Sequence, residues 1–195
     1  MTEAQSKPTL LVIDVQRGFD DPKWGRRNNP QAELNIRKLL EAWRATNMPI
    51  IHAQHCSKEP NSPLRPGFSG NEIKEIVAPL PKEPVLTKNV NSVFIGTNLE
   101  SHLREKQAST LVIVGLTSDH CVSTTARMSA NLGFKTYVVS DATATFDRTG
   151  PDGRTYPADD IHAVNLASLS GEFATIIDTQ TLLQHLHDRS PPFGK

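Results

Sequence analysis

Three residues of different chemical types follow apolar stretches of the chain and could together carry out nucleophilic chemistry. Asp14 ends the run TLLVID, Lys88 follows PVLT, and Cys121 comes shortly after TLVIVG. A thiol has a pKa of about 8.5, and a helix N-terminus or a nearby ammonium group lowers that value and supplies thiolate. Lys88 could provide the ammonium group, and Asp14 could take the thiol proton and return it to a leaving amine. The trio predicts a nucleophilic cysteine hydrolase without a catalytic histidine.

The elements that must position these residues are short apolar strands separated by amphipathic helices. Strands are predicted at residues 9–14, 49–53, 84–87, 110–115, 135–140 and 173–177. Helical spacing lies between them, for example in Ile36, Leu39, Leu40 and Trp43. Because the strands are apolar throughout rather than alternating, both faces of the sheet should be covered. The sequence predicts an α/β protein, a three-layer α/β/α Rossmann-like domain with a six-stranded, mainly parallel sheet.

The segment that carries Cys121 is predicted to begin a helix. Ser118 or Asp119 is the expected N-cap, and Gly133 is the expected C-terminal stop. Cys121 would then lie in the first turn, near unpaired backbone N–H groups that could also stabilise an oxyanion. Ligands of open parallel sheets bind at the carboxyl ends of the strands, where all three reactive residues are expected.

Composition limits the classes of partner. The 195 residues are expected to form one domain over residues 1–195, and 21 basic residues balance 21 acidic ones, so no net charge would recruit nucleic acid or a membrane surface. A small-molecule substrate is the expected partner. The polar N-terminus and the lack of a long apolar segment predict a cytoplasmic protein. In that reducing compartment Cys56 and Cys121 are expected to be free thiols rather than a disulfide.

Three sequence blocks resemble those of the isochorismatase-like hydrolase superfamily, in its cysteine hydrolase and amidase branch. They are VIDVQRGF at 12–19, TKNVNSVF at 87–94 and GLTSDHCVSTTAR at 115–127, within a resemblance that covers about residues 8–183. The resemblance implies a catalytic triad of Asp14, Lys88 and Cys121, with an oxyanion hole made by the N–H groups of Thr117 and Cys121. It also implies a cis peptide between Leu116 and Thr117, the strand order 3-2-1-4-5-6, and a homodimer or homotetramer.

Departures from the family patterns indicate the subclass. Isochorismatases proper cleave a vinyl ether and generally lack the cysteine that this sequence keeps, so an amide-type C–N bond outside a peptide is the expected target. Nicotinamidases hold a metal through an Asp-x-His motif, and Gln54 and Cys56 stand at the matching positions. No metal and no other cofactor is therefore expected. A zinc site at His52 and His55 is disfavoured because alternation along a strand points them to opposite faces.

The substrate pocket is the least determined part of the site. The candidate lining residues lie near the three blocks or in the Pro/Gly-rich loops, and they are Phe19, Trp24, His55, Asn91, Phe94, His120 and Phe146. Roles for Cys56 and His162 stay open, and the residues do not name the substrate. Two alternatives remain: an isochorismatase-type vinyl ether hydrolase with Asp14 as acid, and a non-catalytic redox-sensing domain that uses Cys121 as a reactive thiol.

Overall fold

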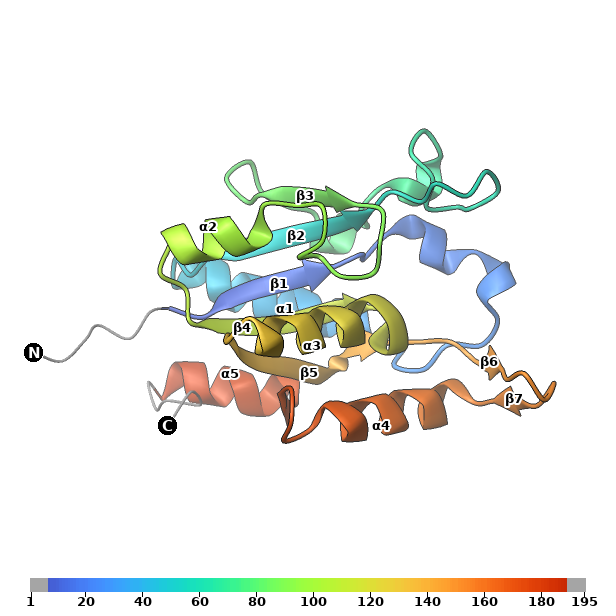
Figure 1. Ribbon diagram of the computed structural model, residues 1–195. Coiled ribbons are helices and arrows are strands. Elements are labelled where there is room, and N and C mark those ends of the chain that lie inside the picture. Colours follow the sequence, from blue (N-terminus) through green and yellow to red (C-terminus); the bar gives the residue numbers. More distant parts are fainter. Residues whose placement is uncertain (1–6, 189–195) are drawn as a thin grey trace, which may run out of the picture.

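A six-stranded parallel sheet forms the centre of the computed structural model, which describes residues 7–188 (Figure 1). The strand order is β3-β2-β1-β4-β5-β8, and each neighbouring pair is parallel. The strands are β1 (Thr9–Ile13), β2 (Ile50–His55), β3 (Val85–Lys88), β4 (Thr110–Leu116), β5 (Lys135–Ala144) and β8 (Thr175–Ile177). The predicted fold class and strand order are confirmed. The sixth strand is numbered β8 because β6 (Arg148–Thr149) and β7 (Thr155–Tyr156) form a separate antiparallel pair.

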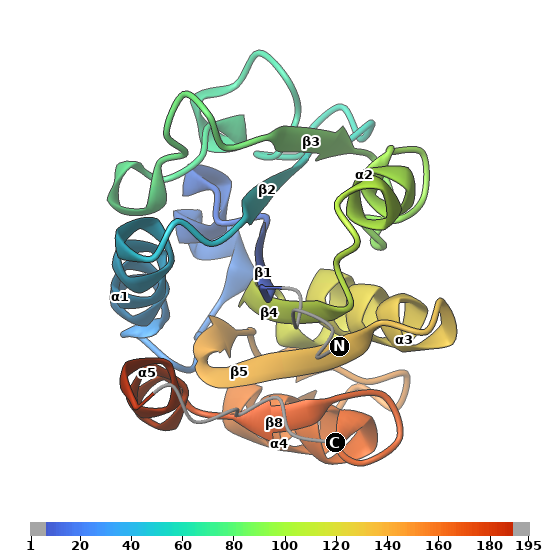
Figure 2. The same cartoon turned by 90° about the vertical axis from the view of Figure 1, so that its left-hand side faces the viewer.

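Helices cover both faces of this sheet and make three layers. Figure 2 shows α1 (Ala32–Ala45) and α5 (Thr179–His187) on one face, with α2 (Leu99–Glu105), α3 (Ser123–Asn131) and α4 (Ala158–Leu169) on the other. Within the part of the chain that the structure describes, no helix combines the length and the apolar character needed to cross a membrane.

The apolar strands are explained by the two cores that they separate. Leu10 and Val12 of β1 belong to the core under α1, whereas Leu11 and Ile13 belong to the core under α2 and α3. A strand that alternates between two buried faces must be apolar at every position. On the α1 side Trp43 is fully buried, and its Nε1 donates a hydrogen bond to Pro8 O at 3.0 Å.

The order in which successive strands join the sheet reverses beside β1. From β1 it proceeds to β2 and β3 on one side, and it returns to β4 and β5 on the other. Gly115 of β4 pairs with Ile13, and a Cβ added there would meet Ile13 O at 2.0 Å. Only glycine allows β4 to approach β1 this closely. The crevice at the carboxyl ends of β1 and β4 is where this class of fold binds ligands.

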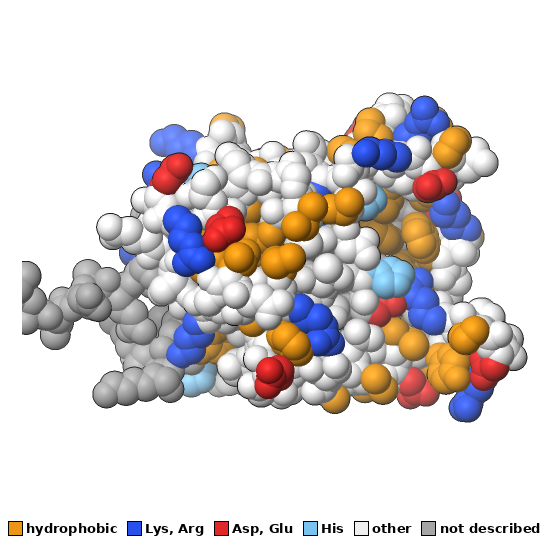
Figure 3. Space-filling view, in the orientation of Figure 1, with side chains coloured by type: hydrophobic (Ala, Val, Ile, Leu, Met, Phe, Trp, Pro, Cys, Tyr) orange, Lys and Arg blue, Asp and Glu red, His pale blue; other side chains and the backbone are white. Residues whose placement is uncertain are grey.

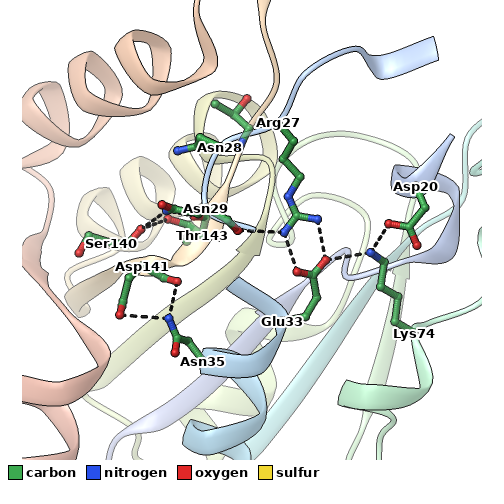
Figure 4. Close-up of polar contacts among 11 residues, drawn as sticks. Asp20, Arg27, Asn28, Asn29, Glu33, Asn35, Lys74, Ser140, Asp141 and Thr143 are labelled. Atoms are coloured by element: carbon green, nitrogen blue, oxygen red, sulfur yellow. Dashed lines mark hydrogen bonds and ion pairs between the residues drawn. The ribbon is translucent and has the colours of Figure 1, made fainter. Parts of the chain in front are cut away.

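Charged and amide side chains tie the loops around this crevice to α1 and β5, as Figure 4 shows. We call Asp20, Arg27, Glu33 and Lys74 the Glu33 cluster. Arg27 donates to both carboxylate oxygens of Glu33, at 2.7 and 2.6 Å, and Lys74 bridges Glu33 and Asp20. Asn29 donates to the backbone oxygens of β5 at Ser140 and Thr143. The loop from residue 17 to 31 is therefore fixed at both ends.

Candidate active site

Asp14, Lys88 and Cys121 meet at the carboxyl ends of three strands. Asp14 directly follows β1, Lys88 is the last residue of β3, and Cys121 lies five residues beyond the end of β4. Lys88 Nζ donates to Asp14 Oδ2 at 2.6 Å and to Cys121 Sγ at 3.3 Å. The three residues are 0%, 4% and 7% exposed, in the same order. A carboxylate, an ammonium group and a thiol thus share one nearly dry site.

Cys121 lies in a π-helical turn, Ser118–Val122, that leads into α3. Thr117 is the N-cap, and its carbonyl oxygen accepts hydrogen bonds from His120 N and Val122 N, both at 3.2 Å. The expectation that Ser118 or Asp119 caps this helix through its side chain is wrong. Each side chain is bound elsewhere: Ser118 Oγ is 2.8 Å from His162 Nδ1, and the Asp119 carboxylate accepts from Thr145 and Arg148. Wide helical turns of this kind are frequent at functional sites.

The peptide bond between Leu116 and Thr117 is cis, at the position that the family resemblance implied. Thr117 is 3% exposed, and its Oγ1 has no hydrogen-bond partner among residues 7–188. Thr117 is the single residue between the end of β4 and the turn that carries Cys121.

Burial governs the protonation of the thiol and the carboxyl group. It raises the pKa of Cys121 well above its ordinary value; Asp14 adds to that effect, and Lys88 opposes it. Burial also raises the pKa of Asp14, again against the effect of Lys88. The expectation that a helix N-terminus and Lys88 give a low thiol pKa is therefore wrong for the resting site. With one cation beside two acidic groups, the arrangement favours one negative charge and one proton shared between Asp14 and Cys121.

Lys88 is surrounded by more acceptors than it has protons. Besides Asp14 and Cys121, its Nζ lies 3.2 Å from Val90 O and 3.3 Å from His55 Nδ1. An ammonium group has three N–H donors, so these four acceptors cannot all be satisfied at once. The thiol sulfur is the weakest acceptor of the four until it ionises.

The same cluster offers ligand atoms for a metal ion, and Lys88 decides against that interpretation. Ligand atoms of Asp14, His55 and Cys121 lie within 4.8 Å of one another. The Lys88 ammonium group, however, is within 3.3 Å of each of these residues, so a buried cation already stands among them. Gln54 donates to Asn71 O at 2.8 Å. These residues fit an ammonium ion rather than a metal.

The two histidines of β2 point to different neighbours, as the alternation predicted. His52 is 1% exposed, and its Nε2 lies 3.1 Å from Glu83 Oε2. His55 faces Lys88 instead. They cannot act together as ligands of one ion.

The aromatic candidates for the pocket separate into two groups. Phe19, Trp24 and Phe146 pack together with ring centroids 5.4 to 6.1 Å apart. Phe94 instead packs against Phe134 at 6.0 Å, in the core on the opposite face of the sheet. Asn91 and His120 are exposed. Only His55 among the proposed pocket residues is within hydrogen-bonding distance of a triad atom in the described part of the chain.

Contacts between the three sequence blocks and residues outside them also support the site. Arg148 of β6 binds Asp119 with its Nε at 2.6 Å, and His162 of α4 contacts Ser118. Gln16 fixes His55, because it accepts from His55 N at 2.8 Å and donates to His55 O at 3.0 Å. No local spacing pattern predicts these pairs, since their members lie 29, 44 and 39 residues apart.

The surface around the site is polar and apolar at once. Figure 3 shows histidine and charged side chains beside apolar ones at the end of the molecule where the strands terminate. A hollow of about 430 Å³ lies between the loops at residues 17–21 and 63–70, and another of about 570 Å³ lies between α1 and α5. Neither hollow is lined by a triad residue.

An isochorismatase domain model matches residues 8–181. The chain belongs to the isochorismatase family. It is 51% identical to the uncharacterized isochorismatase family protein YrdC of Bacillus subtilis over 179 residues, which cover 92% of this chain and 96% of that protein.

Solved structures and other relatives agree with this assignment to an isochorismatase-family hydrolase. A structure of an isochorismatase-family protein from Chromobacterium violaceum superposes with a TM-score of 0.91 at 44% identity and covers 96% of this chain and 97% of its own. The N-carbamoylsarcosine amidase of an Arthrobacter species is 26% identical over an alignment that covers 96% of this chain and 74% of that protein. The family therefore includes an amidase among the relatives of this chain.

Proposed function

We propose that this isochorismatase-family hydrolase cleaves an amide-type C–N bond of a small molecule through a covalent acyl-enzyme on Cys121. The observation that carries the proposal is the position of Lys88, which donates to both Asp14 Oδ2 and Cys121 Sγ in a buried site. The relationship to an N-carbamoylsarcosine amidase supports a C–N bond as the target.

The proton of the thiol has one natural destination. Asp14 Oδ1 is buried and has no hydrogen-bond partner within residues 7–188. Moving the proton from Sγ to this oxygen leaves the charge of the triad unchanged, and Lys88 then stabilises the thiolate in place of the carboxylate. A buried site disfavours separated charge but tolerates this exchange, because no net charge is created. High pKa values of both groups are compatible with this mechanism.

The bond changes follow from that transfer. Sγ attacks the carbonyl carbon, and the C=O oxygen becomes an oxyanion that the N–H groups of Thr117 and Cys121 stabilise. The oxyanion reforms the carbonyl as the C–N bond breaks, and protonated Asp14 gives its proton to the leaving nitrogen. A water molecule then attacks the thioester, Asp14 takes a proton from that water, and the thiol is restored when Sγ leaves and is protonated.

The first test is a panel of amides and ureides that is scored for release of ammonia or amine. Rapid quenching followed by intact-protein mass spectrometry should show an added acyl mass on Cys121 during turnover. Amine release without any covalent adduct on Cys121, under conditions where the next step is slow, would contradict the acyl-enzyme.

A vinyl ether hydrolase is the second candidate, and one observation favours it. The raised pKa of Asp14, which burial causes, suits a general acid. Isochorismate cleavage that survives Cys121→Ala but is lost in Asp14→Asn would support this candidate over the amidase.

A redox-sensing role is less compatible with the site. Sensor cysteines are accessible and have a low thiol pKa, whereas Cys121 is 7% exposed and burial raises its pKa.

The homodimer or homotetramer implied by the resemblance stays a prediction. Light scattering at micromolar concentration should report at least a dimer, and a monomer alone would contradict it.

A further inference from the structure

His55 is held rigidly beside the triad by contacts to its backbone. Gln16 accepts from His55 N and donates to His55 O, and Asn71 Nδ2 also donates to His55 O at 2.8 Å. Gln16 is fully buried and Asn71 is 9% exposed, so these amides form a fixed frame. A ring nitrogen of His55 lies within 4.8 Å of Cys121 Sγ and of an Asp14 carboxylate oxygen. The backbone that carries the imidazole is therefore held in place beside the reaction site.

Lys88 determines which ring nitrogen of His55 carries the proton. An ammonium group can only donate, so Nδ1, which lies 3.3 Å from Lys88 Nζ, can take part in this contact only as the unprotonated acceptor. A neutral imidazole has one N–H, and that proton must then be on Nε2. Burial and the Lys88 charge hold the pKa of His55 below its ordinary value, against the smaller effect of Asp14, which keeps the ring neutral.

The consequence is a hydrogen-bond donor of fixed position at the edge of the triad. His55 is only partly buried, and within residues 7–188 the hydrogen bond found for its ring is the one between Nδ1 and Lys88. The two charged neighbours of the reacting sulfur already have parts in the proposed reaction: Asp14 exchanges the proton and Lys88 supplies the charge.

We propose that His55 is a substrate-recognising residue whose Nε2–H donates a hydrogen bond to the substrate. The substrate then carries an oxygen or nitrogen acceptor close to the scissile carbonyl, in addition to the carbonyl oxygen itself. An N-acylurea, an imide or a carboxylate-bearing amide has such an acceptor, whereas a simple alkyl amide does not. This proposal rests on the proposed hydrolase function, because that function places the ligand against Cys121.

Two isosteric substitutions separate the two edges of the ring. The amide of asparagine reaches about as far as Nδ1, and the amide of glutamine reaches about as far as Nε2. His55→Asn should keep an acceptor for Lys88 but lose the outer donor, whereas His55→Gln should keep an outer donor. On a ureide or a carboxylate-bearing amide that is turned over, we expect His55→Asn to raise KM about tenfold and His55→Gln to raise it less than about threefold.

Alkylation without substrate provides the matched control. The pH dependence of Cys121 alkylation by iodoacetamide should be the same in His55→Asn as in the native protein, because the acceptor for Lys88 is kept. Equal KM values for His55→Asn and the native protein, or equal increases in both variants, would overturn the proposal.

Nuclear magnetic resonance tests the tautomer independently of any substrate. Long-range ¹H–¹⁵N spectra at neutral pH should show His55 with a protonated Nε2 and an unprotonated Nδ1, and a protonated Nδ1 would overturn the proposal. If no member of the amide and ureide panel is turned over, the hydrolase function fails and this proposal fails with it. If a substrate is turned over through Cys121 but its KM is insensitive to His55→Asn, only the role of His55 fails.

Discussion

Two clusters of this protein each pair a buried carboxylate with a lysine, but they satisfy that carboxylate to different extents. In the Glu33 cluster, Arg27 and Lys74 together donate to both oxygens of one carboxylate (Figure 4). In the triad, Lys88 binds one oxygen of Asp14 and leaves the other without a partner in the described part of the chain. The first carboxylate is fully satisfied and the second is not. A spare lone pair on a buried carboxylate weakens the folded state but supplies a base.

The two carboxyl groups consequently respond to pH in opposite directions. Burial tends to raise the pKa of Glu33, but the hydrogen bonds and charges of Arg27 and Lys74 outweigh it and lower that pKa to about 2. The stability that Glu33 contributes is complete above its unfolded pKa of about 4.5 and is lost as the pH falls towards 2. At Asp14 the raised pKa means that ionisation costs stability as the pH rises above the unfolded value of 3.8. Ionisation of Glu33 therefore stabilises the folded protein, whereas ionisation of Asp14 destabilises it.

The largest expected effect is loss of turnover when the thiol is removed. Cys121→Ala should lower kcat on any amide substrate by about 10⁴-fold or more, because no other group can form the acyl-enzyme. Cys56→Ala is the matched control, and its kcat should stay within about twofold. Circular dichroism should show that both variants fold. A Cys121→Ala protein that keeps a tenth of the native rate would contradict the role of Cys121 as nucleophile, and the triad would then have no catalytic function to distinguish it from the Glu33 cluster.

Replacing each lysine in turn tests which of the two acts on the thiol. Lys88→Ala should slow Cys121 alkylation by iodoacetamide at pH 7 by about tenfold or more, since the thiolate loses its neighbouring cation. Lys74→Ala, in the Glu33 cluster, should leave that rate unchanged. The measurement is the alkylation rate against pH, with Cys56 replaced by alanine so that only one thiol reacts. Equal effects of the two substitutions would contradict a special role for Lys88.

Glu33→Gln should affect stability and leave turnover unchanged. Its lowered pKa and nearly complete burial correspond to about 2 to 3 kcal/mol of unfolding free energy at pH 7. Urea unfolding should show that difference at neutral pH, and the difference should shrink as the pH falls from about 4.5 to 2. Glu41→Gln is the control, because the side chain of Glu41 is 63% exposed in its pair with Arg37 and should change stability by less than about 0.5 kcal/mol. A pH-independent deficit in Glu33→Gln would mean that packing, not charge, is responsible.

The fold was predictable from the sequence because it depends on local patterns. Apolar runs such as TLLVI and TLVIVGL became β1 and β4 in the expected order. The extra length of β5, which reaches Ala144 rather than residue 140, was not predictable, because a register shift against β4 permits it.

The candidate site was predictable only in part, for the same reason. The positions of Asp14, Lys88 and Cys121 follow from strand ends, but the pKa of the thiol depends on burial by loops that no periodicity describes. Ser118 contacts His162 and Asp119 binds Arg148, and both partners are distant in sequence. These contacts occupy the two side chains that were expected to cap the helix.

The smallest expected effect concerns the cation of the triad. The Glu33 cluster uses only side-chain cations, and Lys88 stands among Asp14, His55 and Cys121 as the only side-chain cation that hydrogen-bonds to these three within residues 7–188. A catalytic metal would orient and polarise the substrate, and its removal would cost orders of magnitude in rate. Prolonged dialysis against a strong chelator, with metal content measured before and after, should therefore leave turnover within about twofold. Gln54 offers no anionic oxygen for a hard ion, and His52 points to Glu83, so neither replaces the missing ligands of a nicotinamidase-type site. Activity that vanishes on dialysis and returns with zinc would show that Lys88 moves aside for a metal. The triad would then differ from the Glu33 cluster in the kind of cation as well as in the number of cations.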